Sequence, residues 1–153
     1  MATGLVTFRA IQKKYPERAP EKVLADLAAF SGDPGRWFAA AKDAGLLDLA
    51  LTFARSGRTD PLTLSRASRD LLGKDARFSL EAGRLAIRLI VAGYGYEMTG
   101  LDAMDACKHF LAAAEALGIA SEARAEPCAL VAEHPGNFSE ILTRRCLADA
   151  PVH

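Results

Sequence analysis

Apolar residues recur every three to four positions along most of this chain, which is the period of an amphipathic helix. Glycine, proline and Asp-Pro pairs interrupt the pattern at short intervals. Asp33-Pro34 and Asp60-Pro61 are typical helix starts, with a capping residue followed by a first-turn proline. The pattern therefore predicts nine helices with short connections, at about 5–15, 20–31, 34–44, 46–56, 61–72, 76–92, 99–117, 121–133 and 137–147.

Several residues are predicted to begin or end these helices. Asp75 and Thr99 are expected to cap the sixth and seventh, and Pro127 is expected to kink or break the eighth. The expected helix stops are Gly32, Gly45, Gly57 and Gly118.

The pattern also predicts which side chains face the interior. In the second helix the expected apolar stripe is Val23, Leu24, Leu27 and Phe30. The sixth helix is apolar around most of its circumference, which is typical of a central helix.

Composition supports an all-helical fold. Alanine and leucine occur 30 and 20 times, against five valines and five isoleucines. Alanine and leucine are held in a helix at low cost, whereas sheet folds need runs rich in valine and isoleucine. We expect a single all-helical domain over 1–148 and a frayed tail over 149–153.

The spacing of small residues suggests how the helices are arranged. Trp37 and Ala41 precede Gly45, Ala50 follows it, and Asp60 begins the next unit, a texture similar to a tetratricopeptide repeat. The steps between caps are 27 and 39 residues, against about 34 in the standard repeat. We expect a degenerate tetratricopeptide-like α-solenoid of antiparallel helical hairpins, with an irregular helical bundle as the alternative.

Residues 20–118 resemble an uncharacterised bacterial helical-repeat family, a domain of unknown function. The segments that carry the resemblance are Trp37 to Gly45, Thr59-Asp60-Pro61, Thr63-Leu64, Lys74-Asp75, Glu81-Ala82-Gly83 and Gly93-Tyr94-Gly95-Tyr96-Glu97. The resemblance implies a short member of that family or the end piece of a longer solenoid. It implies no activity, and no catalytic residue is carried over from it.

Asp102, Asp105 and His109 form the first candidate for chemistry. Their spacing of i, i+3 and i+7 places two carboxylates and an imidazole on one side of a helix, with Glu97 nearby in sequence. These groups are able to bind a divalent metal. The simpler interpretation is a carboxylate at a helix start and an ordinary i, i+4 pair, so no metal or cofactor is expected.

Charge and aromatic residues form the second candidate. Residues 55–88 carry a net charge of +4 and residues 97–126 carry −4. The basic segment is suited to an acidic peptide, and the two segments together are suited to head-to-tail self-association. The alternatives are solvated helix faces and, for the loop of Tyr94 and Tyr96, a tight turn whose rings cover the core. The predicted contact residues are Trp37, Arg66, Arg69, Arg77, Arg84, Tyr94 and Tyr96.

The remaining features narrow the class of protein. A net charge of zero disfavours general binding to nucleic acid or to a membrane surface, and no apolar run is long enough to span a membrane. Three widely spaced cysteines and no recognisable signal peptide indicate a cytoplasmic protein. We therefore expect a non-catalytic module that binds a protein or peptide. The alternatives are a metal-binding bundle or small metal-dependent enzyme that uses Asp102, Asp105 and His109, and a purely structural end piece.

Overall fold

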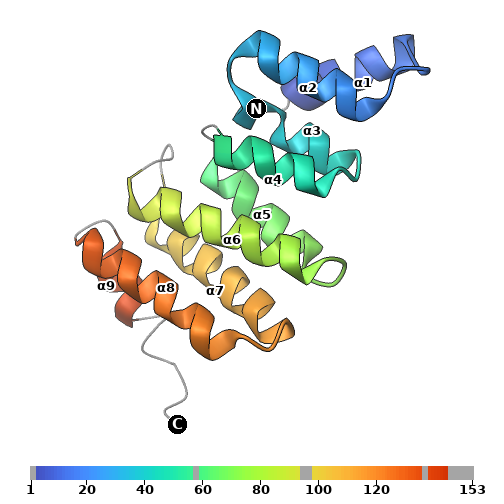
Figure 1. Ribbon diagram of the computed structural model, residues 1–153. Coiled ribbons are helices and arrows are strands. Elements are labelled where there is room, and N and C mark those ends of the chain that lie inside the picture. The colour runs from blue at the N-terminus through green and yellow to red at the C-terminus, as the bar shows by residue number, and fades with distance from the viewer. Residues whose placement is uncertain (1–2, 57–58, 94–97, 136–137, 145–153) are drawn as a thin grey trace. The chain divides into compact units, whose positions relative to one another are not determined.

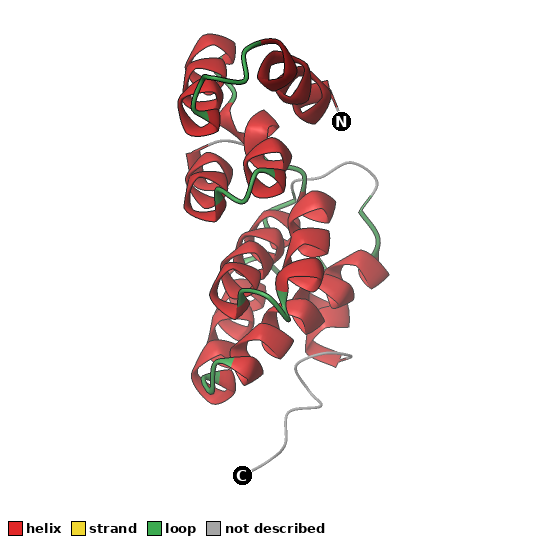
Figure 2. Ribbon diagram, turned by 90° about the vertical axis from the view of Figure 1, so that its right-hand side faces the viewer, coloured by secondary structure: helices red, strands yellow, loops and turns green. Residues whose placement is uncertain are grey.

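The computed structural model describes residues 3–56, 59–93, 98–135 and 138–144. All the regular elements in these ranges are helices, as Figure 2 shows, so the expected all-helical fold is confirmed for them. None of the described helices has the length and apolar character needed to span a membrane. The chain divides into two compact units, Met1–Thr59 and Asp60–His153.

The N-terminal unit holds α1 (Thr3–Lys14), α2 (Pro20–Ser31), a 3-10 turn η1 (Pro34–Trp37), α3 (Phe38–Asp43) and α4 (Leu47–Ser56). The third predicted helix thus begins as a 3-10 turn and becomes α-helical at Phe38. Aromatic side chains fill the core between these helices: Phe8, Trp37, Phe38 and Phe53 are all buried.

The C-terminal unit holds α5 (Pro61–Leu71), α6 (Ala76–Val91), α7 (Gly100–Ala116), α8 (Ala120–Glu133) and α9 (Ser139–Leu142). Helix α6 packs against α5 and α7, as Figure 1 shows, in the central place that its apolar circumference predicts. Phe78 and Ile90 of α6 and Phe110 of α7 are almost completely buried.

Most of the predicted helix boundaries are confirmed. The Asp75 side chain accepts a hydrogen bond from the Phe78 N–H at 3.0 Å. Thr99 and Asp102 form a reciprocal capping box at the start of α7. Asp33 and Asp60 precede their helices as expected, but their side chains make no capping bond to the backbone. Gly32, Gly45 and Gly118 adopt the left-handed backbone of a helix stop, while Gly57 lies outside the described residues.

Two expectations about the helices need correction. Helix α8 runs without interruption through Pro127, whose side chain is fully buried, so the expected break is absent. Packing of that ring offsets the cost of the missing backbone donor. Helix α8 begins at Ala120, one residue before the predicted start. The α-helix α9 is followed by π-helical backbone at residues 143–144, and the predicted end of the ninth helix lies outside the described residues.

Phe30 is the second correction, because it is 93% exposed rather than buried. The inner face of α2 is formed by Val23, Leu24 and Ala28. Successive helix residues are rotated by about 100°, so Phe30 at the end of α2 lies to one side of that face. The core at this end is closed instead by Trp37, whose indole N–H donates to Ser31 Oγ at 3.0 Å.

A close contact of α5, α6 and α7 organises the C-terminal unit. Ser68 Oγ on α5 donates to the Ser79 carbonyl on α6 at 2.7 Å, and Ser79 Oγ donates in return to the Ser68 carbonyl. One turn later, a Cβ placed on Gly83 would lie only 3.0 Å from both Phe110 Cα on α7 and Ser68 Oγ. Gly83 is therefore the residue that lets the three helices approach at this level.

Gly83→Ala is predicted to destabilise the protein by about 1–2 kcal/mol, because overpacking against the Phe110 backbone exceeds the roughly 1 kcal/mol gain in helix propensity. Gly73→Ala is the matched control, since a Cβ there meets nothing within 4 Å and Gly73 is not among the described glycines with positive φ. Urea unfolding followed by circular dichroism measures both. A Gly83→Ala protein as stable as the Gly73→Ala protein would contradict the close-contact argument.

Candidate functional site

The four predicted basic contact residues lie on two neighbouring helices of the C-terminal unit. Arg66 and Arg69 are on α5, and Arg77 and Arg84 are on α6. Arg66, Arg69 and Arg77 are exposed, and Arg69 Nε donates to the adjacent Asp70 carboxylate at 2.9 Å. Within the described ranges, Arg66 and Arg77 have no ion-pair partner. The contact role of these three residues stays a prediction.

Arg84 differs from the others, because its guanidinium is held by acidic neighbours. Its Nε and Nη2 donate to the two carboxylate oxygens of Glu126 on α8 at 2.7 and 2.8 Å, and its Nη1 donates to Glu81. The hydrogen bond with Glu126 raises the pKa of Arg84 above its ordinary value, against the opposing effect of burial. Its Cζ lies 5.8 Å from the centre of the Phe110 ring. Arg84 thus connects α6 to α8 across α7.

Of the predicted aromatic contact residues, the structure describes only Trp37. Trp37 is only 4% exposed and its indole N–H is used by Ser31, so its ring lies in the core of the N-terminal unit. Tyr94 and Tyr96 lie outside the described residues.

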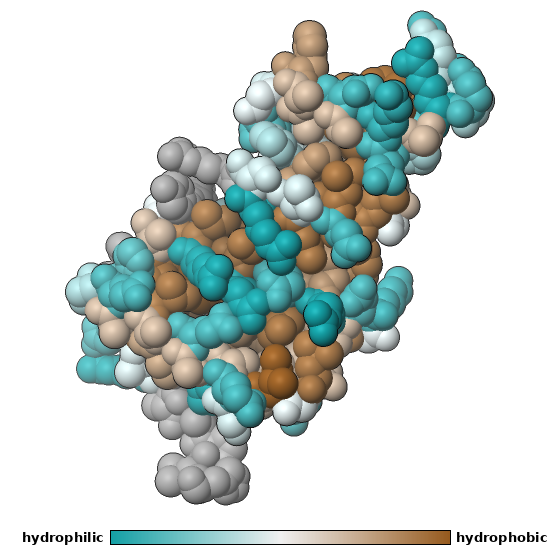
Figure 3. Space-filling model, in the orientation of Figure 1, coloured by the Kyte–Doolittle hydropathy of each residue, from teal (hydrophilic) through white to brown (hydrophobic). Residues whose placement is uncertain are grey.

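Figure 3 shows hydrophilic residues across the face formed by α6 and α8, with apolar residues between them.

The proposed metal ligands are used in other ways. The Asp102 carboxylate accepts a hydrogen bond from the Thr99 N–H at 2.9 Å, inside the capping box. Asp105 and His109 interact one turn apart on α7. In the part of the chain that the structure describes, no three His, Cys, Asp or Glu side chains are grouped so as to hold a metal ion.

His109 on α7 interacts electrostatically with Arg69 and Asp70 on α5. Burial lowers the pKa of its imidazole below the ordinary value. Asp105 on the same helix raises it, Arg69 on α5 lowers it, and Asp70 and Lys108 contribute smaller opposing effects. The outcome is a histidine that resists protonation in the folded state.

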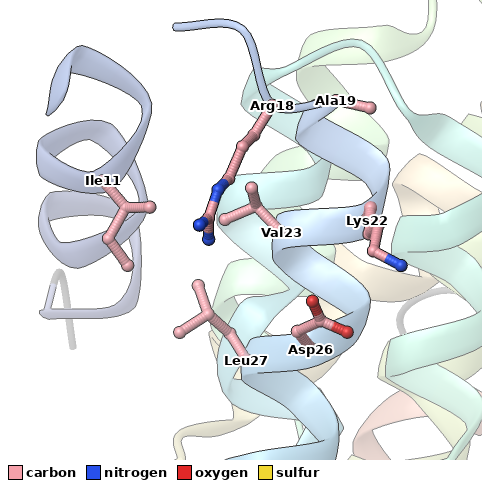
Figure 4. Close-up of a pocket in the computed structure, with 7 residues that line it drawn as sticks. All are labelled: Ile11, Arg18, Ala19, Lys22, Val23, Asp26 and Leu27. Atoms are coloured by element: carbon pink, nitrogen blue, oxygen red, sulfur yellow. The ribbon is translucent and has the colours of Figure 1, made fainter. Parts of the chain in front are cut away.

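One surface that the sequence reasoning missed lies between α1 and α2. We name it the α1–α2 pocket. It has a volume of about 430 Å³ and is lined by Ile11, Arg18, Ala19, Lys22, Val23, Asp26 and Leu27. Figure 4 shows Ile11 on α1 facing Val23 and Leu27 on α2, with the Arg18 side chain extending between the two helices. Arg18 Cζ also lies 4.7 Å from the centre of the Tyr15 ring.

Phe30 continues this surface along α2. We use the name α2 outer strip for Lys22, Asp26 and Phe30, which follow one another at intervals of four residues and are all exposed. Because Phe30 is 93% exposed, nearly the whole ring is in contact with solvent. Sequence periodicity assigned Phe30 to the buried stripe, since Leu27 and Phe30 are separated by a core-like interval of three residues.

Glu126→Gln is predicted to reduce the free energy of unfolding by about 1–2 kcal/mol, because Arg84 loses a charged bidentate partner in a partly buried setting. The matched control is Glu140→Gln. Its ion pair with Arg144 is 74% exposed on both sides and is worth about 0.5 kcal/mol or less. Urea unfolding compares the two. Equal losses would show that the Arg84 pair does not connect α6 and α8 energetically.

His109 gives a predicted pH dependence of stability. Its pKa is lower in the folded protein than the ordinary value of about 6.5, so below that pH the unfolded chain binds more protons. Stability should therefore fall as the pH decreases from about 7 to 5. His109→Gln should lose this part of the dependence. Melting temperatures across this range measure it, and identical slopes for the two proteins would refute the assignment.

The chain was compared with protein-family models, with curated proteins and with solved structures, and none of the three comparisons found a match.

Proposed function

We propose that this chain is a non-catalytic helical scaffold that docks another protein chain on α2. The supporting observation is the exposed Phe30 beside the α1–α2 pocket. An aromatic ring in water next to a pocket with several apolar lining residues is typical of a protein contact, because aromatic anchors contribute much of the energy of such interfaces. Removing a phenylalanine side chain from water contributes about 1.5–3 kcal/mol.

The scaffold part of the proposal rests on how consecutive helices pair. α3 packs against α4, α5 against α6, and α7 against α8. Each pair is joined by a short turn, the arrangement of helical hairpins in tetratricopeptide-like repeats. We therefore propose that both units belong to one degenerate solenoid. Cys128 is an exposed free thiol, which supports placing the protein in a reducing, cytoplasmic compartment.

The basic residues of the C-terminal unit are a less direct candidate for docking. Arg66 and Arg77 are exposed and suited to an acidic partner. Arg84 is not a suitable residue for testing them, because its charge reversal would break the contact with Glu126 and destabilise the fold. Arg66→Glu and Arg77→Glu avoid this difficulty.

A photoreactive benzoylphenylalanine at position 30 tests the docking surface in cells that produce the chain. We expect a cross-linked protein at this position, because the side chain is predicted to lie inside a protein contact. The matched control places the same group at Val6, which is 62% exposed on α1. The proposal fails if position 30 yields no cross-linked product above the Val6 background.

A further inference from the structure

We infer that the α2 outer strip binds a second copy of this chain, through a two-fold symmetric contact in which Phe30 of each copy enters the α1–α2 pocket of the other. This inference rests on the proposed docking function and names its partner. In a two-fold contact the same surface serves both subunits, so each projection needs a matching cavity on that same surface. The N-terminal unit carries both.

The α1–α2 pocket is large enough for a phenyl ring. The α1–α2 pocket has a volume of about 430 Å³, and an apolar cavity of about 150 Å³ is large enough for a benzene ring. Its apolar lining includes Ile11, Val23 and Leu27. Phe30 lies at the opposite end of α2 from Ala19, a pocket residue that directly precedes the helix. Two antiparallel α2 helices would therefore place each Phe30 beside Ala19, at the edge of the other copy's pocket.

The charges on the α2 outer strip are complementary under two-fold symmetry. Lys22 and Asp26 stand one turn apart on the α2 outer strip, and neither has an ion-pair partner among the described residues. A two-fold axis level with Leu24 lies midway between them in sequence. It sets Lys22 of each copy opposite Asp26 of the other, forming two equivalent ion pairs. A parallel contact in the same register would oppose like charges instead.

Arg18 at the rim of the pocket is able to contact Phe30 of the other copy. With the axis at this level, Phe30 of one copy lies opposite Arg18 and Ala19 of the other. The Arg18 guanidinium already lies against the Tyr15 ring at 4.7 Å. It is therefore placed to cover a second aromatic ring through a cation–π contact. In the symmetric dimer, Phe30, the pocket, Lys22 and Asp26 of each copy therefore all contact the other copy.

The size of the surface sets the strength of the contact. The α2 outer strip and the pocket extend over the 12 residues of α2, or about 18 Å. Stable complexes bury about 800 Å² on each partner, and contacts smaller than this belong to the weak class. The expected dimer is therefore reversible and dependent on concentration.

Sedimentation equilibrium of the purified chain over a wide concentration range tests the inference. We expect a reversible monomer–dimer equilibrium for the wild type. Lys22→Asp and Asp26→Lys should each weaken it about tenfold, since each creates two like-charge contacts. The double variant Lys22→Asp/Asp26→Lys restores both pairs with opposite polarity, so it should regain most of the wild-type affinity.

Two controls complete the design. Lys13→Asp makes the same charge change as Lys22→Asp at an exposed position on α1, outside the pocket and the strip, and should leave the dimer unchanged. Phe30→Ser should weaken the dimer while preserving the fold, because the side chain makes little contact within the chain. Urea unfolding confirms that each variant is folded.

The outcomes separate this inference from the proposed function. A wild-type chain that stays monomeric at all concentrations overturns the inference, and so does a dimer insensitive to Phe30→Ser and to the charge exchange. If the chain is monomeric but benzoylphenylalanine at position 30 cross-links a different protein in cells, the docking function stands and the second copy is rejected. Failure of both measurements rejects the docking surface itself.

Discussion

The close approach of α5, α6 and α7 at Gly83 is the constraint on which the C-terminal unit depends. A glycine in the middle of a helix lowers its intrinsic stability, yet here it lets the Phe110 backbone come within van der Waals distance of α6. In the same buried layer, the Ser68 and Ser79 hydroxyls each donate to the backbone carbonyl of the other residue. With these helices fixed, Arg84 is positioned to hold Glu126 on α8, and the fully buried Pro127 follows directly in the chain. The helices of the C-terminal unit are thus held together by the small residues at 68, 79 and 83 and by the ion pair of Arg84 and Glu126.

Local signals along the chain predicted the helices well. The Asp75 cap, the Thr99 capping box and the glycine stops each depend on residues within a turn of one another, so the sequence contains the information needed to identify them. The break expected at Pro127 is absent and Phe30 is not buried, because both outcomes depend on distant partners. A proline is tolerated in α8 where its ring is packed, and Phe30 is excluded from the core because Trp37 and Ser31 close that end of α2.

In the candidate sites, too, local signals can be identified in the sequence, whereas contacts between distant residues cannot. The pair of Glu81 and Arg84, three residues apart on one helix, is a local signal that the sequence contains, whereas only the fold reveals that Arg84 is also held by Glu126, 42 residues away along the chain. Asp102 likewise resembles a ligand until its role in the cap is seen. The α1–α2 pocket has no sequence motif, because it arises from the angle between two helices rather than from any spacing of residues.

The single tryptophan of the chain lies in the N-terminal unit, buried and bound to Ser31. Its fluorescence therefore reports on the environment of that unit alone, whereas circular dichroism at helical wavelengths averages over both units. A natural optical label on one half allows the cooperativity of the whole chain to be examined without adding a probe. Coincident transitions by the two methods would describe one cooperative structure, and separated transitions would describe two units that unfold independently.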